Sequence, residues 1–208
     1  MKRNSSGAWF RLAFKFVKAA GRVANTFVST VCFRMLCLLN GIQLGKSAKA
    51  IGLPSVNVSL GGVARIGNSF YIRSGVGNTE IGRSGSRIRV GPKGTLSMGN
   101  RVGMSNATIV CENVIDIGDD VFIGGGVQIF DTNFHSTDAA VRTSGRETRE
   151  DVRTAPVHIG ARVFLGADAI ICKGVSIGDE SIVAVGSVVV SSIPSGEVWG
   201  GNPARKIR

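Results

Sequence analysis

The stretch that decides the fold runs from residue 159 to 188 and divides into hexamers: IGARVF, LGADAI, ICKGVS, IGDESI and VAVGSV. Each hexamer starts with an aliphatic residue and carries a small or branched residue four places later. Such a six-residue period rotates around a 3.6-residue helix instead of keeping to one face. It keeps to one face when each hexamer is a short strand plus a turn and three hexamers close one triangular coil of a β-helix. We therefore predict an all-β solenoid with an inward column of Ile159, Leu165, Ile171, Ile177, Val183 and Val189 and, after these, Val163, Ala169, Val175, Ser181 and Ser187.

The same phase extends toward the N-terminus. Clean copies begin at Ile117, Ile123 and Ile129, and looser copies begin at Ile66, Ile81, Met98 and Met104. The phase is lost over residues 131–156, DTNFHSTDAAVRTSGRETREDVRTAP, and resumes unshifted at Ile159. This pattern predicts a polar loop that leaves a completed coil and returns to it, and long polar loops on rigid scaffolds usually carry function.

Upstream of the repeats, apolar residues recur at helical spacing from Trp9 to Leu39, with a stripe of four basic residues opposite them. Two interpretations of this helix remain open. It lies on an anionic membrane surface as an interfacial amphipathic helix, or it caps the coil with its apolar face. We divide the chain into a basic helical segment, 1–45, and a β-helix domain, 46–208, which ends in a tail over 194–208. The basic stripe is Arg11, Lys15, Lys18 and Arg22.

The net charge of +11 belongs to the N-terminal part of the chain. Residues 1–79 contain eleven Lys or Arg and no Asp or Glu, whereas residues 80–208 contain fourteen of each sign. Basicity confined in this way, with eight of the thirteen aromatic residues in residues 1–71, argues against a nucleic-acid partner. Four charges inside the apolar stretch argue against a secretory or membrane-spanning segment. We expect a cytoplasmic protein, to which the membrane interpretation of the helix would add a peripheral contact on the inner face of the membrane.

The candidate chemistry lies with two histidines. His135 is in the loop beside Asp131 and Asp138, whereas the hexapeptide phase places His158 on the outside of a coil strand. A zinc site like that of the γ-class carbonic anhydrases needs three histidines, so no metal is predicted. The sequence contains neither a GxSxG elbow nor a Walker loop, and its four cysteines form no CxxC pair, which favours reduced thiols.

The hexapeptides, the loop with one histidine, and the motifs PVHIG and GNPARKIR resemble those of the hexapeptide-repeat acyltransferases over about residues 40–208. With the basic helix and DTNFHSTD, the chain most resembles the bacterial capsular and exopolysaccharide sugar O-acetyltransferases. The resemblance implies a left-handed parallel β-helix, a homotrimer, and acetyl-CoA as the acyl donor. It also implies transfer to a hydroxyl of a lipid-linked or nucleotide-linked sugar in surface polysaccharide biosynthesis. The alternatives are N-acetylation of an amino sugar and a non-catalytic β-helix scaffold.

The resemblance assigns roles to particular residues. His135 matches the general base that takes the proton of the acceptor hydroxyl and returns it to the leaving thiolate. Either Asp131 or Asp138 would orient its imidazole, and the sequence does not choose between them. Val190 and Ser191 stand where Thr and Lys are usual in the family, and Met104 stands where one subfamily has Asn. The positions matched to acetyl-CoA contacts are Ala167, Val185, Val190 and Ser191, with Arg205 and Arg208 near the adenosine phosphates.

Overall fold

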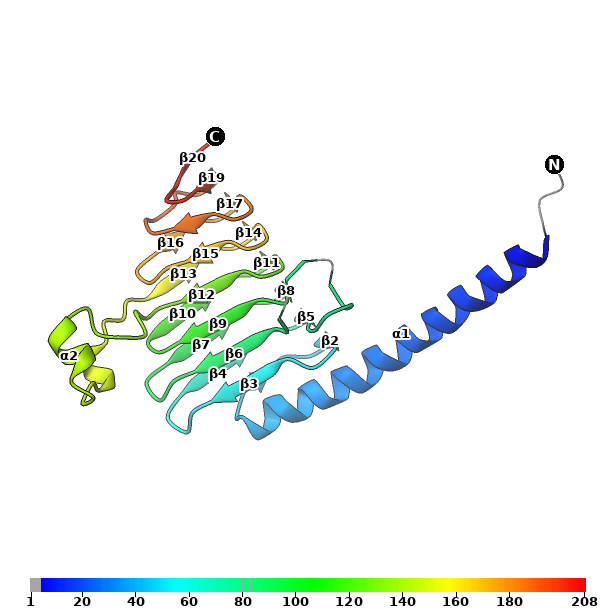
Figure 1. Cartoon of the computed structure of the whole chain (residues 1–208), viewed down its shortest axis with the longest axis horizontal. Coiled ribbons are helices and arrows are strands. Elements are labelled where there is room, and N and C mark those ends of the chain that lie inside the picture. The colour runs from blue at the N-terminus through cyan, green and yellow to red at the C-terminus, as the bar shows by residue number, and fades with distance from the viewer. Residues whose placement is uncertain (1–4, 80, 83) are drawn as a thin grey trace.

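The computed structural model of the chain describes residues 5–79, 81–82 and 84–208. It shows a parallel β-helix with a long helix, α1 (Ser5–Leu39), across its base and a loop projecting from one side (Figure 1). Successive strands feed three sheets in turn, as the hexapeptide period requires. The all-β solenoid with an N-terminal helix, predicted from the sequence, is therefore confirmed.

Sheets 1 and 2 form two sides of the prism. All their neighbouring strands pair in parallel, except for the last pair of sheet 2, β19 and β20, which is antiparallel. Sheet 1 contains, in spatial order, β1 (Gln43–Leu44), β4 (Val63–Ile66), β7 (Thr95–Met98), β10 (Val114–Ile117), β13 (Val157–Ile159) and β16 (Ser176–Ile177). Sheet 2 contains β2 (Lys49–Ile51), β5 (Tyr71–Arg73), β8 (Gly103–Ser105), β11 (Phe122–Ile123), β14 (Phe164–Leu165), β17 (Ile182–Val183), β19 (Val198–Gly201) and β20 (Ala204–Lys206).

Sheet 3 closes the prism. It contains β3 (Ser55–Val58), β6 (Arg87–Val90), β9 (Thr108–Cys111), β12 (Gln128–Phe130), β15 (Ile170–Ile171) and β18 (Val188–Val189).

The two ends of the solenoid lie close to the boundaries expected from the sequence. The first strand, β1, begins at Gln43, three residues ahead of the boundary placed at 46. The last two strands, β19 and β20, lie within the stretch 194–208.

The core is the aliphatic column that the phase predicted. Ile117, Ile159 and Ile177 stack in register through β10, β13 and β16, each at most 3% exposed. The other inward positions from Val163 to Val189 are also buried. Because each aliphatic side chain packs on its equivalent one coil away, the column gains from burial at every step along the axis.

One looser copy of the repeat was predicted wrongly. Ile81 is 48% exposed, because the chain leaves the coil between β5 and β6. The buried side chain of Asn106 holds this excursion, since its Oδ1 accepts the Gly75 N–H (2.9 Å) and its Nδ2 donates to the Gly82 carbonyl (2.8 Å). Gly75 has a φ of +98°, which favours glycine. A glycine-rich segment with an amide to bind it therefore forms a loop instead of a strand.

The long loop leaves after β12 and returns at β13, so its observed limits match 131–156. A bridge between Thr132 and Thr154 closes its base. The Ala155 N–H donates to the Asp131 carbonyl at 2.9 Å beside this bridge. Within the loop lie the short helix α2 (Ala139–Thr143) and the 3₁₀ turn η1 (Arg149–Asp151). The loop is thus clasped at its base and folded along its length.

The two halves of α1 have different surroundings. In the C-terminal half, Ser29, Phe33 and Cys37 are buried against the first coil. Two hydrogen bonds fix this contact, from the Ala50 N–H to Thr30 Oγ1 (3.0 Å) and from the Gly52 N–H to Ser29 Oγ (3.0 Å). The side chains of residues 9–25 are exposed, and this part of the helix projects beyond the coil (Figure 1). By length and composition alone, residues 9–39 could cross a membrane, a test that soluble core helices and signal sequences also pass.

Candidate active site

His135 is positioned by an unusual backbone conformation just before it. Phe134 has a φ of +65°, which a bulky residue adopts only where its surroundings impose it. The Phe134 N–H donates to Thr132 Oγ1 at 3.1 Å, and its ring lies 5.3 Å from that of Phe130. This turn leaves the His135 side chain 69% exposed at the surface of the loop.

Glu147 is the carboxylate that orients His135. Its Oε2 lies 2.8 Å from His135 Nδ1, and its Oε1 accepts the Ser136 N–H. The hydrogen bond with His135, followed by that from Ser136, lowers the pKa of Glu147. An ionised carboxylate at Nδ1 favours the tautomer that carries its proton there, which leaves the Nε2 lone pair ready to accept a proton. The arrangement has the form of a general base with its orienting acid.

Asp131, one of the two acids predicted to orient His135, does not contact it. Its buried carboxylate accepts the N–H groups of Glu112 and Asn113, both at 2.7 Å. Burial raises the pKa of Asp131, although these two hydrogen bonds oppose the shift. Asp131 therefore fastens the loop base to the turn after β9, and its assignment to the catalytic group is corrected to a structural one.

Asp138, the other predicted acid, caps α2. Its Oδ1 accepts the N–H groups of Ala140 (2.8 Å) and Val141 (3.3 Å), as an N-cap residue does. Its assignment is corrected in the same way. Glu147 was missed because it lies twelve residues beyond His135, and only the return of the loop brings the two together. The sequence pointed to Glu147 only as one of several acidic residues in the loop.

His158 lies where the phase count predicted. It is on the outer face of β13, half exposed, with Nδ1 3.1 Å from Asp116 Oδ2 on the adjacent strand. Exposed ion pairs of this kind contribute little to stability. His158 is part of the polar outer surface of sheet 1.

The residues matched to acetyl-CoA contacts lie on two edges of the prism and at its C-terminal end. Ala167 and Val185 stack on the edge between sheets 2 and 3, where the Gly186 N–H donates to the Ala167 carbonyl at 2.8 Å. Val190 and Ser191 follow β18 on the edge between sheets 3 and 1, from which the loop departs. Arg205 is in the terminal hairpin β19–β20, and Arg208 ends the chain.

These positions suit the groups of a coenzyme A molecule. Val185 is 71% exposed and Ala167 is half-buried, so small apolar side chains and backbone groups face outward along their edge. At the end of the coil, Lys206 pairs with Glu197 at 2.6 Å. Arg205 and Arg208 have no ion-pair partner within the part of the chain that the structure describes, although Arg205 Nη1 donates to the Ala204 carbonyl at 2.9 Å, so both keep an uncompensated positive charge that suits phosphates.

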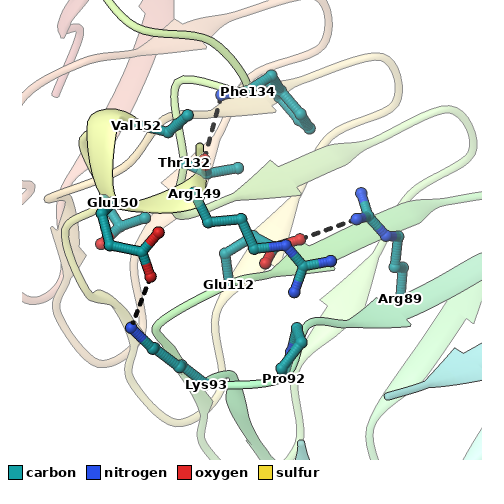
Figure 2. Close-up of a pocket in the computed structure, with 10 residues that line it drawn as sticks. Arg89, Pro92, Lys93, Glu112, Thr132, Phe134, Arg149, Glu150 and Val152 are labelled. Atoms are coloured by element: carbon teal, nitrogen blue, oxygen red, sulfur yellow. Dashed lines mark hydrogen bonds and ion pairs between the residues drawn. The ribbon is translucent and has the colours of Figure 1, made fainter. Parts of the chain in front are cut away.

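A pocket of about 550 Å³ lies beneath the loop, next to the residue that precedes His135 (Figure 2). Two ion pairs cross it, Arg89–Glu112 at 3.0 Å and Lys93–Glu150 at 3.1 Å. The hydrogen-bond donors and acceptors of these side chains, together with an aromatic wall, could bind the hydroxyl groups and apolar face of a sugar ring. The remaining lining residues are Pro92, Thr132, Phe134, Arg149, Val152 and Thr154.

Comparison with known proteins agrees with this architecture. The family model described as the hexapeptide repeat of succinyl-transferase matches residues 156–191. The galactoside O-acetyltransferase of Escherichia coli K12 is 36% identical over 103 residues, which cover 50% of this chain and 48% of that protein. The 2,3,4,5-tetrahydropyridine-2,6-dicarboxylate N-acetyltransferase of Clostridium perfringens is 49% identical over 53 residues, covering 26% and 22%. The chain thus spans about half the length of the galactoside enzyme that it matches.

A solved structure shares the fold over most of the chain. It is a galactoside acetyltransferase in complex with coenzyme A, 24% identical, with a TM-score of 0.55, covering 84% of this chain and 68% of that one. The fold is thus a left-handed parallel β-helix with a histidine-bearing loop. In its hexapeptide repeats and in these matches, the chain is similar to the hexapeptide-repeat acetyltransferases.

Proposed function

We propose that this protein transfers an acetyl group from acetyl-CoA to a sugar hydroxyl in the synthesis of a surface polysaccharide. The observation that carries the proposal is the contact between His135 Nδ1 and the Glu147 carboxylate, because it prepares Nε2 as a base on the loop. The match to a galactoside O-acetyltransferase supports a sugar acceptor. Coenzyme A in a solved structure of this fold supports the donor.

The chemistry needs one base and no covalent enzyme intermediate. Acetyl-CoA supplies a thioester whose carbonyl carbon is the electrophile. His135 Nε2 takes the proton from the acceptor hydroxyl as that oxygen forms a bond to the carbonyl carbon. Glu147 stabilises the imidazolium that results, and His135 then gives the proton to the thiolate as the carbon–sulfur bond breaks. The products are an acetylated sugar and free coenzyme A.

We place the acceptor in the pocket beneath the loop. Phe134 forms part of its wall and is joined directly to His135, so a sugar bound there would lie close to the loop that carries the base. The lining presents Arg149 and two ion pairs to hydroxyl or phosphate groups of the acceptor. A lipid-linked or nucleotide-linked sugar would carry both kinds of group.

A homotrimer would complete the site. Ala167 and His135 lie on different edges of one prism, so they face different directions in a single chain. In an assembly of rods side by side, one edge of each rod meets another edge of its neighbour. An exposed apolar ladder supports such packing, since Phe122, Phe164 and Ile182 stack in register on the outer face of sheet 2. The 69% exposure of the base in one chain also calls for a neighbour to cover it.

Acetyl-CoA and sugar intermediates place the reaction in the cytoplasm, and a lipid-linked acceptor would place it at the inner face of the membrane. The second candidate reaction is N-acetylation of an amino sugar, which the match to an N-acetyltransferase over 53 residues favours. Both reactions use the same base. They differ in the bond formed, since an O-acetyl ester is cleaved by mild alkali and an N-acetyl amide is not.

The test incubates the purified protein with acetyl-CoA and a panel of sugars, nucleotide sugars, lipid-linked sugars and amino sugars, following thiol release. We expect release that depends on a hydroxyl acceptor and an alkali-labile product. Transfer to amines alone would establish the N-acetyl reaction. The proposal would be contradicted if no acceptor in the panel raised thiol release above the rate at which water hydrolyses acetyl-CoA.

A further inference from the structure

One stripe of α1 changes its role along the helix. Residues at a spacing of three and four are cationic in the N-terminal half and buried against the coil in the C-terminal half. The face of α1 that carries the basic residues in its N-terminal half is therefore the face that packs on the coil in its C-terminal half. In order, the stripe is Arg11, Lys15, Lys18, Arg22, Thr26, Ser29, Phe33 and Cys37.

The rest of α1 is mainly apolar and exposed, although Arg34 and Thr30 lie on it and form hydrogen bonds with Ala48 and Ala50 of the coil. This corrects the expectation that a capping helix would turn its apolar face inward. The apolar side chains of this face are between 47% and 79% exposed, a far larger patch than single surface hydrophobic residues make. The apolar face consists of Trp9, Phe10, Leu12, Phe14, Phe16, Val17, Val23, Phe27, Val28, Val31, Met35, Leu38 and Leu39.

A cationic groove lies where the two halves meet. It has a volume of about 550 Å³ between α1 and β2, with Arg22, Arg34 and Lys49 around it and Phe27 in its wall. A hydrogen bond from Arg34 Nη2 to the Ala48 carbonyl (3.3 Å) holds one of these cations at the groove. The three cations form no ion pair with the residues that the structure describes, 5–79, 81–82 and 84–208. The groove thus offers three positive charges next to an apolar surface.

We propose that the protein docks on an anionic lipid bilayer through the apolar face of α1, with a lipid phosphate in the groove formed by Arg22, Arg34 and Lys49. The charge of the chain matches this partner, because residues 1–79 contain no acidic side chain. Apolar side chains enter the interfacial layer, and the basic residues reach the headgroups from the opposite side of the helix. Each basic residue near an anionic surface adds attraction that salt screens.

The geometry favours a helix lying in the membrane plane. The segment from Val23 to Leu39 contains only one charged residue, Arg34, but one of its faces is buried on the coil. A helix packed in this way along half its length cannot be surrounded by lipid there. Figure 1 shows α1 crossing the base of the solenoid, so a surface beneath the helix leaves the loop and the terminal hairpin in water.

The experiment is co-sedimentation of the full chain with phosphatidylglycerol/phosphatidylcholine vesicles and with pure phosphatidylcholine vesicles, at low and high salt. We expect binding to the anionic vesicles that weakens with salt. Absence of binding to anionic vesicles at low salt would overturn the proposal. Binding that survives both high salt and alkaline carbonate would also overturn it, since it would indicate a spanning helix.

Variants separate the two parts of the proposed surface. Replacing Phe10 and Phe16 by Ser should weaken binding at least a hundred-fold, because both rings would otherwise enter the apolar layer. Leu60→Ser is the control, since Leu60 is a fully exposed apolar residue in the turn between β3 and β4, outside α1. Wild-type binding by the double Phe variant would overturn the docking face. Loss of an oligomer in that variant, without vesicle binding by the wild type, would show that a second copy covers the face.

The groove is tested by Lys49→Gln against Arg65→Gln. Both residues are exposed cations on strands of the first two coils, but only Lys49 lies at the groove. We expect Lys49→Gln to weaken binding to anionic vesicles about five-fold and Arg65→Gln to leave it unchanged. Equal effects of the two substitutions would overturn the assignment of the groove as the phosphate site. Thermal unfolding of each variant monitors the fold, and thiol release on a soluble acceptor should stay at the wild-type rate.

Discussion

Replacing Glu147 by glutamine tests whether the loop contains a prepared base. The amide keeps the size of the side chain, and its oxygen can still accept the Ser136 N–H. Its NH₂ group would then face His135 Nδ1, which would have to accept a hydrogen bond instead of donating one. The proton would move to Nε2, the atom that must take the hydroxyl proton. Glu147→Gln should therefore lower kcat without moving any backbone.

The size of the effect follows from the surroundings of the pair. A positioned base contributes about 10²- to 10⁴-fold to a rate. His135 is 69% exposed and the Glu147 side chain 18%, so water can partly compensate a wrong tautomer. We expect a loss near the lower limit, about 10²-fold in kcat, with the KM for acetyl-CoA unchanged. His135→Ala should cost at least as much.

The assay is thiol release against pH for the wild type, Glu147→Gln and the control Glu180→Gln. Glu180 is exposed, and its ion-pair partner among the described residues is Arg162 at 2.9 Å, so its amide should change kcat less than two-fold. A Glu147→Gln enzyme with wild-type kcat would refute the role of Glu147.

Three further predictions follow from other parts of the structure. Asp131→Ala leaves two backbone N–H groups without an acceptor, so the free energy of unfolding measured by chemical denaturation should fall by about 2–5 kcal/mol. The loss for Asp138→Ala should be about 1 kcal/mol, and equal losses would contradict the assignment of Asp131 as the residue that fastens the loop base. Phe164→Arg should dissociate the proposed trimer in sedimentation, and an oligomer of unchanged mass would exclude sheet 2 as the interface. The pKa of Glu147 is lowered, so its stabilisation of the loop is complete above about pH 4.3. That stabilisation is lost as the pH falls through the lowered value, so proteolysis of the loop should begin only at acidic pH below this limit, and cleavage that already begins near neutral pH would contradict this.

The fold was predictable because the hexapeptide period is a local signal. An inward residue such as Ile171 repeats every six positions regardless of its distant neighbours, and the structure buries it. The copy at Ile81 failed because an aliphatic residue in phase does not reveal that glycines and Asn106 draw the segment out of the coil. The period predicts strands only where the turns between them are equally regular.

The candidate site was predictable in part. The loop and His135 stand out as a break in the period that contains one of two histidines. Glu147 could not be chosen, because a loop without periodicity gives no rule for which of its carboxylates returns to the imidazole. The direction of the apolar face of α1 was also hidden, since the helical pattern shows that a face exists and not on which side the coil packs.

The most direct test of the central claim compares wild-type protein and His135→Ala in acetyl transfer from acetyl-CoA to the best hydroxyl acceptor of the panel, with the acetylated sugar identified by mass and alkali lability. The account predicts an O-acetyl sugar and stoichiometric thiol release by the wild type, and a kcat lower by about 10²- to 10⁴-fold in the variant, with its oligomeric state unchanged. Transfer at the wild-type rate by a folded His135→Ala protein would contradict it.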